Sequence, residues 1–407
     1  MHVKLIQRNL YLDKLISIKR TPDIKIITGV RRSGKSRLME QFIEWIRTNE
    51  PGSNIIFIDL TSLRYEDLKE YHNLNNYIED HYEGAKENYL FIDEVQLCPN
   101  FELTINSLHS SGNYDIYVTG SNAFLLSSDL ATLFTGRTYE VEVYPFSFSE
   151  YLEYFKSNDI QDAFDQYIKI GGMSGAYPYK EQDERYKYIE DVFDTLIVRD
   201  IQQKYNIRKL MLMDYITDFM MDNISNLTSA RKIADTLTLS LDEINHKTVN
   251  VYMSYLCNAF AFYKVKRFDI RGKKYLSSND KYYLSDHAFR YAKLGTKNMD
   301  YGRMIENIVA IELLRRGYEI YAGVLYKKEI DFVAMKRSEK IYIQVSDNIS
   351  EERTLKREVE PLLHIKDAYP KMLIARTKHE EYQYEGIRII DVAEWLSKDI
   401  NRSSRGI

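Results

Sequence analysis

The 407-residue chain is poor in cysteine, proline and glycine. Its 2 cysteines, Cys98 and Cys257, are too few for a disulfide framework or a four-thiolate metal site. With 7 prolines and 17 glycines, the chain also lacks the composition of collagen-like or linker-rich proteins. No run of 18 apolar residues is present, and the first residues lack the apolar core of a signal peptide. We therefore expect a cytoplasmic protein without a membrane span.

An excess of charge of one sign is also absent. The chain has 56 Lys+Arg against 60 Asp+Glu, a formal net charge of -4. This balance excludes a histone-like basic protein and an acidic tail protein, although it leaves room for a local basic patch. Hydrophobic residues are abundant at 44%, which excludes intrinsic disorder. At about 150 residues per domain, the length predicts two or three domains.

Short apolar runs alternate with helical patterns in the first 145 residues. The runs cover residues 25–28, 54–59, 89–93 and 115–120, with a further short run at 139–143. Apolar strands separated by helices indicate a parallel sheet that is covered on both faces. The sequence therefore predicts an α/β fold for this part of the chain.

A complete phosphate-binding motif follows the first of these runs. Residues 29–36, Gly-Val-Arg-Arg-Ser-Gly-Lys-Ser, match G-x-x-x-x-G-K-[ST] at every fixed position. The glycines let backbone amides surround one phosphate, and the next helix adds its positive N-terminal end. We expect Lys35, also a catalytic candidate, to bind the β- and γ-phosphates, and Ser36 to bind Mg²⁺. The predicted nucleotide-binding residues of this segment are Gly29, Val30, Arg31, Arg32, Ser33, Gly34, Lys35, Ser36 and Arg37.

Two carboxylates end the third run. Residues 90–92 are apolar, and Asp93 and Glu94 follow them directly. This pattern delivers both acids to the carboxyl edge of a sheet, where ligands bind in open α/β folds. We expect Asp93 to hold Mg²⁺ through water, and Glu94 to act as general base on the attacking water. An acidic strand end is common by itself, but together with the phosphate loop it favours nucleotide hydrolysis.

Two further positions have two interpretations each. Ser121 or Asn122, after the fourth run, could position water or contact the γ-phosphate, or could form a strand-to-helix turn with an N-cap. Arg137 could reach the nucleotide of a neighbouring subunit as a catalytic arginine, or could be an ordinary surface arginine. Asn122 and Arg137 therefore enter the candidate site with both alternatives open.

These motifs together resemble the AAA+ ATPase superfamily, and more closely a prokaryotic branch in which the ATPase module precedes a C-terminal domain of unknown function. The resemblance is carried by residues 28–36, 90–96, 118–122, 133–137, 144–151, 171–172 and 198–201. It implies Mg²⁺ and ATP as cofactors, a P-loop ATPase core over residues 1–145 and a helical lid over 146–205. It also implies Arg199 as a nucleotide-sensing candidate, with a salt-bridged helix arginine as the alternative.

Residues 206–297 are predicted to form a winged-helix-like domain. A short capped helix over 227–234 precedes an amphipathic helix, and a basic hairpin follows. Residues 261–281 hold seven positive and two negative side chains, a local charge of +5, which suits contact with DNA phosphates. A packing or protein-docking module with a solvated basic edge explains the same pattern. The candidate DNA contacts are Lys247, Lys266, Arg267, Arg271, Lys273 and Lys274.

Residues 298–407 resemble the restriction-endonuclease-like fold. Glu306 on an amphipathic helix and Asp331 on a strand match two acids that gather a divalent metal in that fold. Gln344 and Ser346 stand where the fold has a further acid and a lysine, so we expect no ammonium at this centre. The resemblance thus implies a nuclease-like domain that does not cleave nucleic acid. The alternative is an ordinary α/β domain with a buried aspartate.

From these parts we expect a Mg²⁺-dependent ATPase that couples ATP hydrolysis to domain rearrangement and to nucleic-acid or protein binding. One alternative is a nucleotide-gated DNA-binding or regulatory module with little hydrolysis, and another is a nuclease. ATP, DNA, a protein partner and further copies of the chain are the expected partners.

Overall fold

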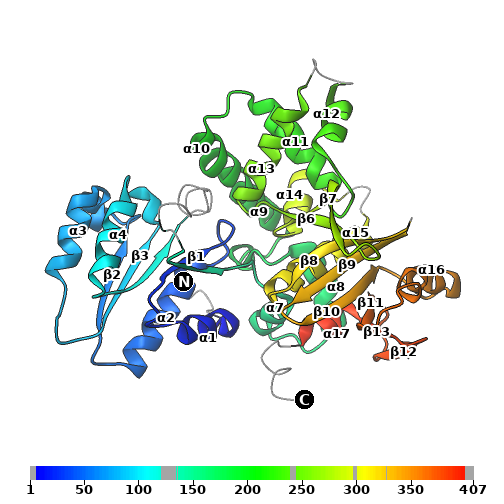
Figure 1. The fold of residues 1–407 in the computed structure, drawn as a ribbon, viewed down its shortest axis with the longest axis horizontal. Helices are drawn as coiled ribbons and strands as arrows, with labels where there is room; N and C mark the ends of the chain where they lie inside the picture. The colour runs from blue at the N-terminus through cyan, green and yellow to red at the C-terminus, as the bar shows by residue number, and fades with distance from the viewer. Residues whose placement is uncertain are drawn as a thin grey trace. The chain divides into compact units, whose positions relative to one another are not determined.

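The computed structural model describes residues 6–120, 134, 136–238, 244–296, 300–326 and 328–398. The chain divides into two compact units, Met1–Val143 and Tyr144–Ile407 (Figure 1). Among the helices within the described ranges, none combines the length and the apolar character that crossing a bilayer requires.

The first unit is built on a five-stranded parallel sheet (Figure 1). The strand order is β2-β3-β4-β1-β5, and every pair in it is parallel, which confirms the predicted α/β fold. The strands are β1 (Ile24–Thr28), β2 (Asn54–Asp59), β3 (Asn88–Asp93), β4 (Asp115–Thr119) and β5 (Thr138–Glu142). The helices are α1 (Asn9–Ser17), α2 (Lys35–Asn49), η1 (Leu63–Lys69), α3 (Tyr71–Asp80), η2 (Val95–Leu97) and α4 (Phe101–Ser111).

Alternate residues of these strands face two different layers of helices. Ile26 and Ile92 belong to a core that includes residues of α3 and α4. The neighbouring Phe91 and Tyr117 stack on each other and contact Phe42 of α2. Because successive side chains of a strand point to opposite faces, a sheet covered on both sides requires a continuous apolar run. The apolar runs of the sequence therefore reflect burial on both faces.

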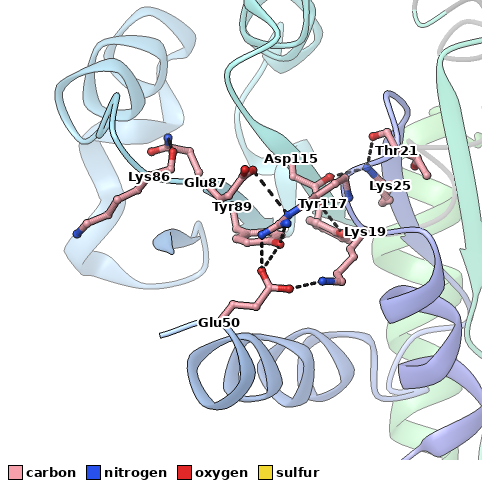
Figure 2. Close-up of polar contacts among 11 residues, drawn as sticks. Lys19, Thr21, Lys25, Glu50, Lys86, Glu87, Tyr89, Asp115 and Tyr117 are labelled. Carbon is pink, nitrogen blue, oxygen red and sulfur yellow. Dashed lines mark hydrogen bonds and ion pairs between the residues drawn. The ribbon is translucent and has the colours of Figure 1, made fainter. Parts of the chain in front are cut away.

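A polar network lies at the amino end of this sheet (Figure 2). The ammonium of Lys25 in β1 is fully buried; it donates to the carbonyl oxygen of Thr21 at 2.6 Å and forms an ion pair with Asp115 of β4. Asp115 also accepts a hydrogen bond from the hydroxyl of Tyr117 at 2.9 Å. A buried charge is tolerated only when it is paired and hydrogen-bonded, so this pair ties β1 to β4.

The second unit contains an eight-stranded mixed sheet with the order β12-β13-β11-β10-β9-β8-β6-β7. Its strands are β6 (Phe262–Asp269), β7 (Lys274–Leu284), β8 (Glu319–Leu325), β9 (Lys328–Lys336), β10 (Glu339–Ser346), β11 (Lys371–Ala375), β12 (Tyr382–Tyr384) and β13 (Ile387–Asp391). Strands on both sides of residue 297 share this sheet, because β6 pairs in parallel with β8. A boundary at residue 297 would therefore run through one sheet.

The helices of the second unit come from three stretches of the chain. The segment expected to form the lid contributes α7 (Phe148–Phe155), α8 (Ile160–Ile170), η3 (Ser174–Ala176), α9 (Gln182–Thr195), η4 (Leu196–Gln202) and α10 (Gln203–Tyr205). The segment expected to be winged-helix-like contributes α11 (Leu210–Asp222), α12 (Ala230–Thr238), α13 (His246–Asn258) and α14 (Ala288–Leu294). The last stretch contributes α15 (Tyr301–Arg315), α16 (Glu352–Leu363) and α17 (Val392–Ser397).

A pair of glycines allows a close backbone approach inside this unit. A Cβ atom at Gly171 would lie 2.1 Å from a carboxylate oxygen of Asp286, and one at Gly172 would lie 2.3 Å from the carbonyl oxygen of Phe146. The amide of Gly172 donates to Asp286 at 2.7 Å, and the amide of Phe146 donates to Gly172 at 2.8 Å. Only residues without a side chain fit this junction, which joins the segment of α7 and α8 to the strand end after β7. The role of these helices as an ATPase lid stays a prediction.

The buried pair at the amino end of the first sheet generates a stability prediction. Asp115→Ala would leave the ammonium of Lys25 without its charged partner, so we expect the free energy of unfolding to fall by about 3 kcal/mol or more. Chemical denaturation of the full chain measures this loss. Glu40→Ala is the matched control, because it breaks the exposed Arg37–Glu40 pair and is expected to change stability by less than about 1 kcal/mol. Equal effects of the two substitutions would contradict the prediction.

Candidate nucleotide-binding site

The loop between β1 and α2 has unusual backbone geometry at three positions. Gly29 has a φ of 133°, and a Cβ atom there would lie 2.1 Å from the carbonyl oxygen of Val143. Arg32 has a φ of 66°, and Gly34, directly before α2, has a φ of 98°. Positive φ values bend the chain tightly, and such bends let successive amide groups face a common anion. The loop therefore ends at the N-terminus of α2 with the shape that a phosphate cradle requires.

Lys35 at the start of α2 folds back onto this loop. Its Nζ donates to the carbonyl oxygen of Gly29 at 2.9 Å and to that of Val30 at 3.2 Å, and the residue is buried. A buried ammonium needs acceptors, and these two loop carbonyl groups are among the acceptors of Lys35. Hydrogen bonds between two charged groups are stronger than those to neutral carbonyls, so a phosphate at the loop would offer Lys35 a better acceptor.

Three oxygen-bearing side chains meet at the carboxyl edge of the sheet. The carboxylate of Asp93, the last residue of β3, accepts a hydrogen bond from the hydroxyl of Thr119, and the hydroxyl of Ser36 is near enough to lower the pKa of Asp93. Burial raises the pKa of Asp93, and these two hydroxyls oppose the shift. Because β3 and β4 are adjacent and parallel, their last residues share one edge. A carboxylate and a hydroxyl next to the phosphate loop are suitable oxygen ligands for Mg²⁺.

Glu94 follows β3 in a left-handed conformation with a φ of 55°. Its amide donates to the hydroxyl of Thr119 at 3.1 Å, and its carboxylate accepts a hydrogen bond from the side-chain amide of Gln96 at 2.5 Å. A non-glycine residue with positive φ is uncommon, and strained backbone of this kind is concentrated at functional sites. Thr119 thus holds both acids, Asp93 through its carboxylate and Glu94 through its backbone.

Thr119 is the site residue that the sequence analysis missed. Ser121 and Asn122, the candidates after the same strand, lie outside the described part of the chain, as does the side chain of Arg199. The one available signal was the position of Thr119 at the end of a buried strand, next in space to the strand that ends at Asp93. Arg137 is exposed directly before β5, a position that leaves both of its interpretations open.

The second unit brings Glu306 of α15 and Asp331 of β9 together around an unexpected partner. The ammonium of Lys281 lies 2.8 Å from a carboxylate oxygen of Glu306, 2.6 Å from Glu329 and 3.4 Å from Asp331. The expectation of no ammonium at this centre is therefore wrong. In the sequence, Lys281 is one of the seven positive side chains of the basic hairpin. The sequence shows its charge, but it does not show from which side of the strand the side chain projects. Burial raises the pKa of Glu306 to about 7, and Lys281 opposes this shift.

The candidate DNA-contacting residues lie on α13 and on the hairpin of β6 and β7. Lys264 in the same hairpin forms an ion pair with Asp280 at 2.9 Å, so part of the local positive charge is neutralised within the domain. Arg267 is half-buried. The exposed members of the predicted set are Lys247, Lys266, Arg271, Lys273 and Lys274.

Two protein-family models match parts of the chain. Residues 21–152 match a family described as an AAA domain. Residues 161–300 match a family described as a domain of unknown function (DUF8612). The solved structure of a Walker-type ATPase from Pyrococcus abyssi is similar to this chain with a TM-score of 0.50 at 17% identity, covering 71% of this chain and 95% of that one. That likeness shows a shared fold.

Two sequence relatives extend over most of the chain. An uncharacterized protein of Methanocaldococcus jannaschii is 27% identical over 363 residues, covering 84% of this chain and 78% of that protein. An uncharacterized protein of Haemophilus influenzae is 38% identical over 407 residues, covering 97% of this chain and 100% of that protein. The chain therefore belongs to the same family as the Haemophilus protein, a family of prokaryotic P-loop ATPases of the AAA+ superfamily in which an AAA domain precedes a domain of unknown function.

Proposed function

We propose that this protein binds Mg²⁺-ATP at residues 29–36 and hydrolyses it, with Glu94 as the general base. The observation that carries the proposal is the meeting of Ser36, Asp93 and Thr119 at one edge of the sheet. It joins the last residue of the phosphate-binding motif to the acid that ends β3 and to the threonine that ends β4. A P-loop ATPase needs both groups within reach of one metal ion.

Each residue of the loop has a proposed role in this reaction. The backbone amides of the loop and Lys35 bind the phosphates, and Lys35 also stabilises charge that develops on the γ-phosphate. Ser36 and Asp93 are the residues that would hold Mg²⁺, which supplies neutralisation of phosphate charge when it is bound. The nucleotide-binding segment also includes Arg31, Arg32 and Arg37. Asn122 would position water or contact the γ-phosphate. Arg137 would act as a catalytic arginine on the nucleotide of a neighbouring copy of the chain.

Glu94 is suited to the proton transfer by its position and its orientation. It would accept a proton from the water that attacks the γ-phosphorus, while the bond to the β-γ bridging oxygen breaks and ADP leaves. The bonds from Thr119 and Gln96 hold the backbone and the carboxylate of Glu94 in place, so little reorganisation is needed when water arrives.

We also propose that hydrolysis is coupled to rearrangement of the second unit and to DNA binding by its basic hairpin. The exposed cations of α13, β6 and β7 support this proposal, because cationic side chains on one element bind phosphates by releasing counterions. The helix α13 contains no arginine that could pair with guanine. We therefore expect the protein to recognise the phosphate backbone of DNA rather than its base sequence.

The general base can be tested by steady-state ATP turnover. Glu94→Gln is expected to lower kcat by about 100-fold or more while ATP binding persists, since the amide cannot accept the proton. Lys35→Ala is expected to abolish binding, and Glu66→Gln, an exposed acid of the same unit, is the matched control. Background turnover by the unsubstituted protein with intact ATP binding would instead favour a nucleotide-gated module.

The role of the missed residue can be tested separately. Thr119→Val removes the hydroxyl that serves both Asp93 and Glu94, so we expect kcat at saturating Mg²⁺ to fall by about 10-fold or more. Thr119→Ser keeps the hydroxyl and is expected to retain most of the activity. Turnover unchanged in Thr119→Val would show that the hydroxyl does not support the site.

DNA binding has a salt signature that charge removal must change. Replacing both Lys273 and Lys274 by glutamine is expected to reduce the slope of log affinity against log salt by about 1.8 for duplex DNA, or 0.9 for each lost contact. Fluorescence anisotropy with a labelled duplex measures the slope, and Lys187→Gln, an exposed lysine on α9, is the control. An affinity that does not depend on salt would exclude this interface.

A further inference from the structure

The carboxylate centre of the second unit does not fit the divalent metal that a restriction-endonuclease-like fold implies. Its centre is filled by the ammonium of Lys281, which is 2% exposed and reaches three carboxylates. We infer that Lys281 takes the place of a metal ion, so that this domain carries a built-in cation and neither binds a divalent metal nor cleaves nucleic acid. This inference is independent of the proposed ATPase activity.

The ammonium of Lys281 competes with a metal ion for the same acids. Glu306 and Asp331, the two acids that would hold a metal, are the ones that Lys281 contacts at 2.8 Å and 3.4 Å. A divalent ion between them would lie a few ångströms from the ammonium, in surroundings where like charges repel strongly. To admit the ion, Lys281 would have to give up its ion pairs with these two acids, and a buried charge that loses its partners costs several kcal/mol.

The remaining ligands of a metal site are already engaged. One carboxylate oxygen of Asp331 accepts the amide of Val345 at 2.9 Å. Gln344, which stands where an acid is expected, accepts the amide of Asp331 at 3.3 Å and donates to Glu358 at 3.2 Å. Across the described residues, no group of three acidic, histidine or cysteine side chains has an arrangement able to hold a metal ion. Mg²⁺ demands near-octahedral oxygen ligands, and this centre lacks them.

Backbone pairing explains how a hairpin lysine reaches this centre. Lys281 pairs with Val265 across the hairpin of β6 and β7, at the point where the strand register shifts. Beyond it, the amide and carbonyl of Leu284 both hydrogen-bond to the side chain of Asn307, at 2.7 Å and 2.9 Å. These bonds hold β7 against α15, and Glu306 is the neighbour of Asn307. The two strands and the helix thus fix Lys281 and Glu306 relative to each other.

The inference can be tested by Mn²⁺ titration calorimetry on the full chain without nucleotide. A Lys35→Ala background removes the ammonium of the phosphate loop and serves as the common reference. With Lys281 present we expect no Mn²⁺ binding in the micromolar range. Lys281→Met is expected to bind one Mn²⁺ at least 10-fold more tightly, and adding Asp331→Asn should abolish that gain. Micromolar binding with Lys281 present, or Mg²⁺-dependent DNA cleavage that Lys281→Met eliminates, would overturn the inference.

A second variant keeps the inference testable if Lys281→Met does not fold. Glu306→Gln removes one negative charge and leaves Lys281 with Glu329 and Asp331. We expect this variant to fold and to show the same thermal midpoint with and without Mn²⁺, as the unsubstituted protein should. A Mn²⁺-dependent rise of the midpoint that Glu306→Gln removes would mean that the centre binds metal.

A separate observation in the first unit concerns Arg8, which precedes α1. Its guanidinium donates to the carbonyl oxygen of Ser33 in the phosphate loop at 2.8 Å, and the residue is 3% exposed. Its backbone amide donates to the side chain of Gln41 at 3.2 Å, and Gln41 in turn donates to the carbonyl oxygen of Ile6 at 2.7 Å. The segment before α1 is thereby fixed along α2.

The contact acts on the peptide group between Ser33 and Gly34. In a trans peptide the carbonyl oxygen and the following N–H point in opposite directions. Arg8 therefore fixes the direction of the Gly34 amide, which is one of those offered to a phosphate at the start of α2. We propose that Arg8 is a positioning residue of the phosphate loop, a role that rests on the ATP binding proposed above.

Separate measurement of KM and kcat tests this role. Arg8→Ala is expected to raise KM for ATP by about 10-fold and to leave kcat within about threefold, since the loop can still close around bound phosphate. Arg8→Lys keeps a charged donor and should restore part of the affinity. If the unsubstituted protein binds ATP and Arg8→Ala has the same KM, this role alone is refuted. If the unsubstituted protein does not bind ATP, the proposed function fails.

Discussion

The first unit depends on one constraint, the parallel register of β1, β3 and β4. The strand β4 lies between β3 and β1 and runs parallel to both, so the carboxyl ends of all three strands meet at one edge. There the carboxylate of Asp93 contacts Thr119 and the serine of the phosphate loop. At the opposite edge the buried pair of Lys25 and Asp115 joins β1 to β4. A shift of one residue in β4 would turn its side chains to the other face and break the contacts at both edges.

Charge burial imposes an equally strict condition on the second unit. Three carboxylates converge between β7, β9 and α15; two of them, Glu306 and Asp331, are buried, and buried carboxylates require a cation or a proton nearby. Lys281 supplies the cation through ion pairs with all three, and a raised pKa allows Glu306 to carry a proton near neutrality. A side chain fixed to the backbone cannot leave as a metal ion can. The centre is therefore suited to holding strands and a helix together rather than to chemistry.

The two units differ in how far their sites follow from local sequence. The phosphate loop is a contiguous segment, and its glycines and Lys35 have conformational and chemical roles that a single stretch of chain reveals. The role of Thr119 depends on the pairing of β3 with β4, and its partner Asp93 lies 26 residues earlier in the chain. Lys281 contacts Glu306 and Asp331 across separations of 25 and 50 residues. Neither contact leaves a pattern in the local sequence.

Residue order alone was enough to predict the α/β class of the first unit, the place of the phosphate loop and the two acids at the carboxyl end of β3. These features follow from apolar runs and from a motif in which neighbouring residues act together. The folded chain was needed to show that Thr119 holds both acids, that the segments on either side of residue 297 share one sheet, and that an ammonium fills the carboxylate centre. The reason is physical: strand order, strand twist and the side from which a side chain projects arise from pairing between distant segments.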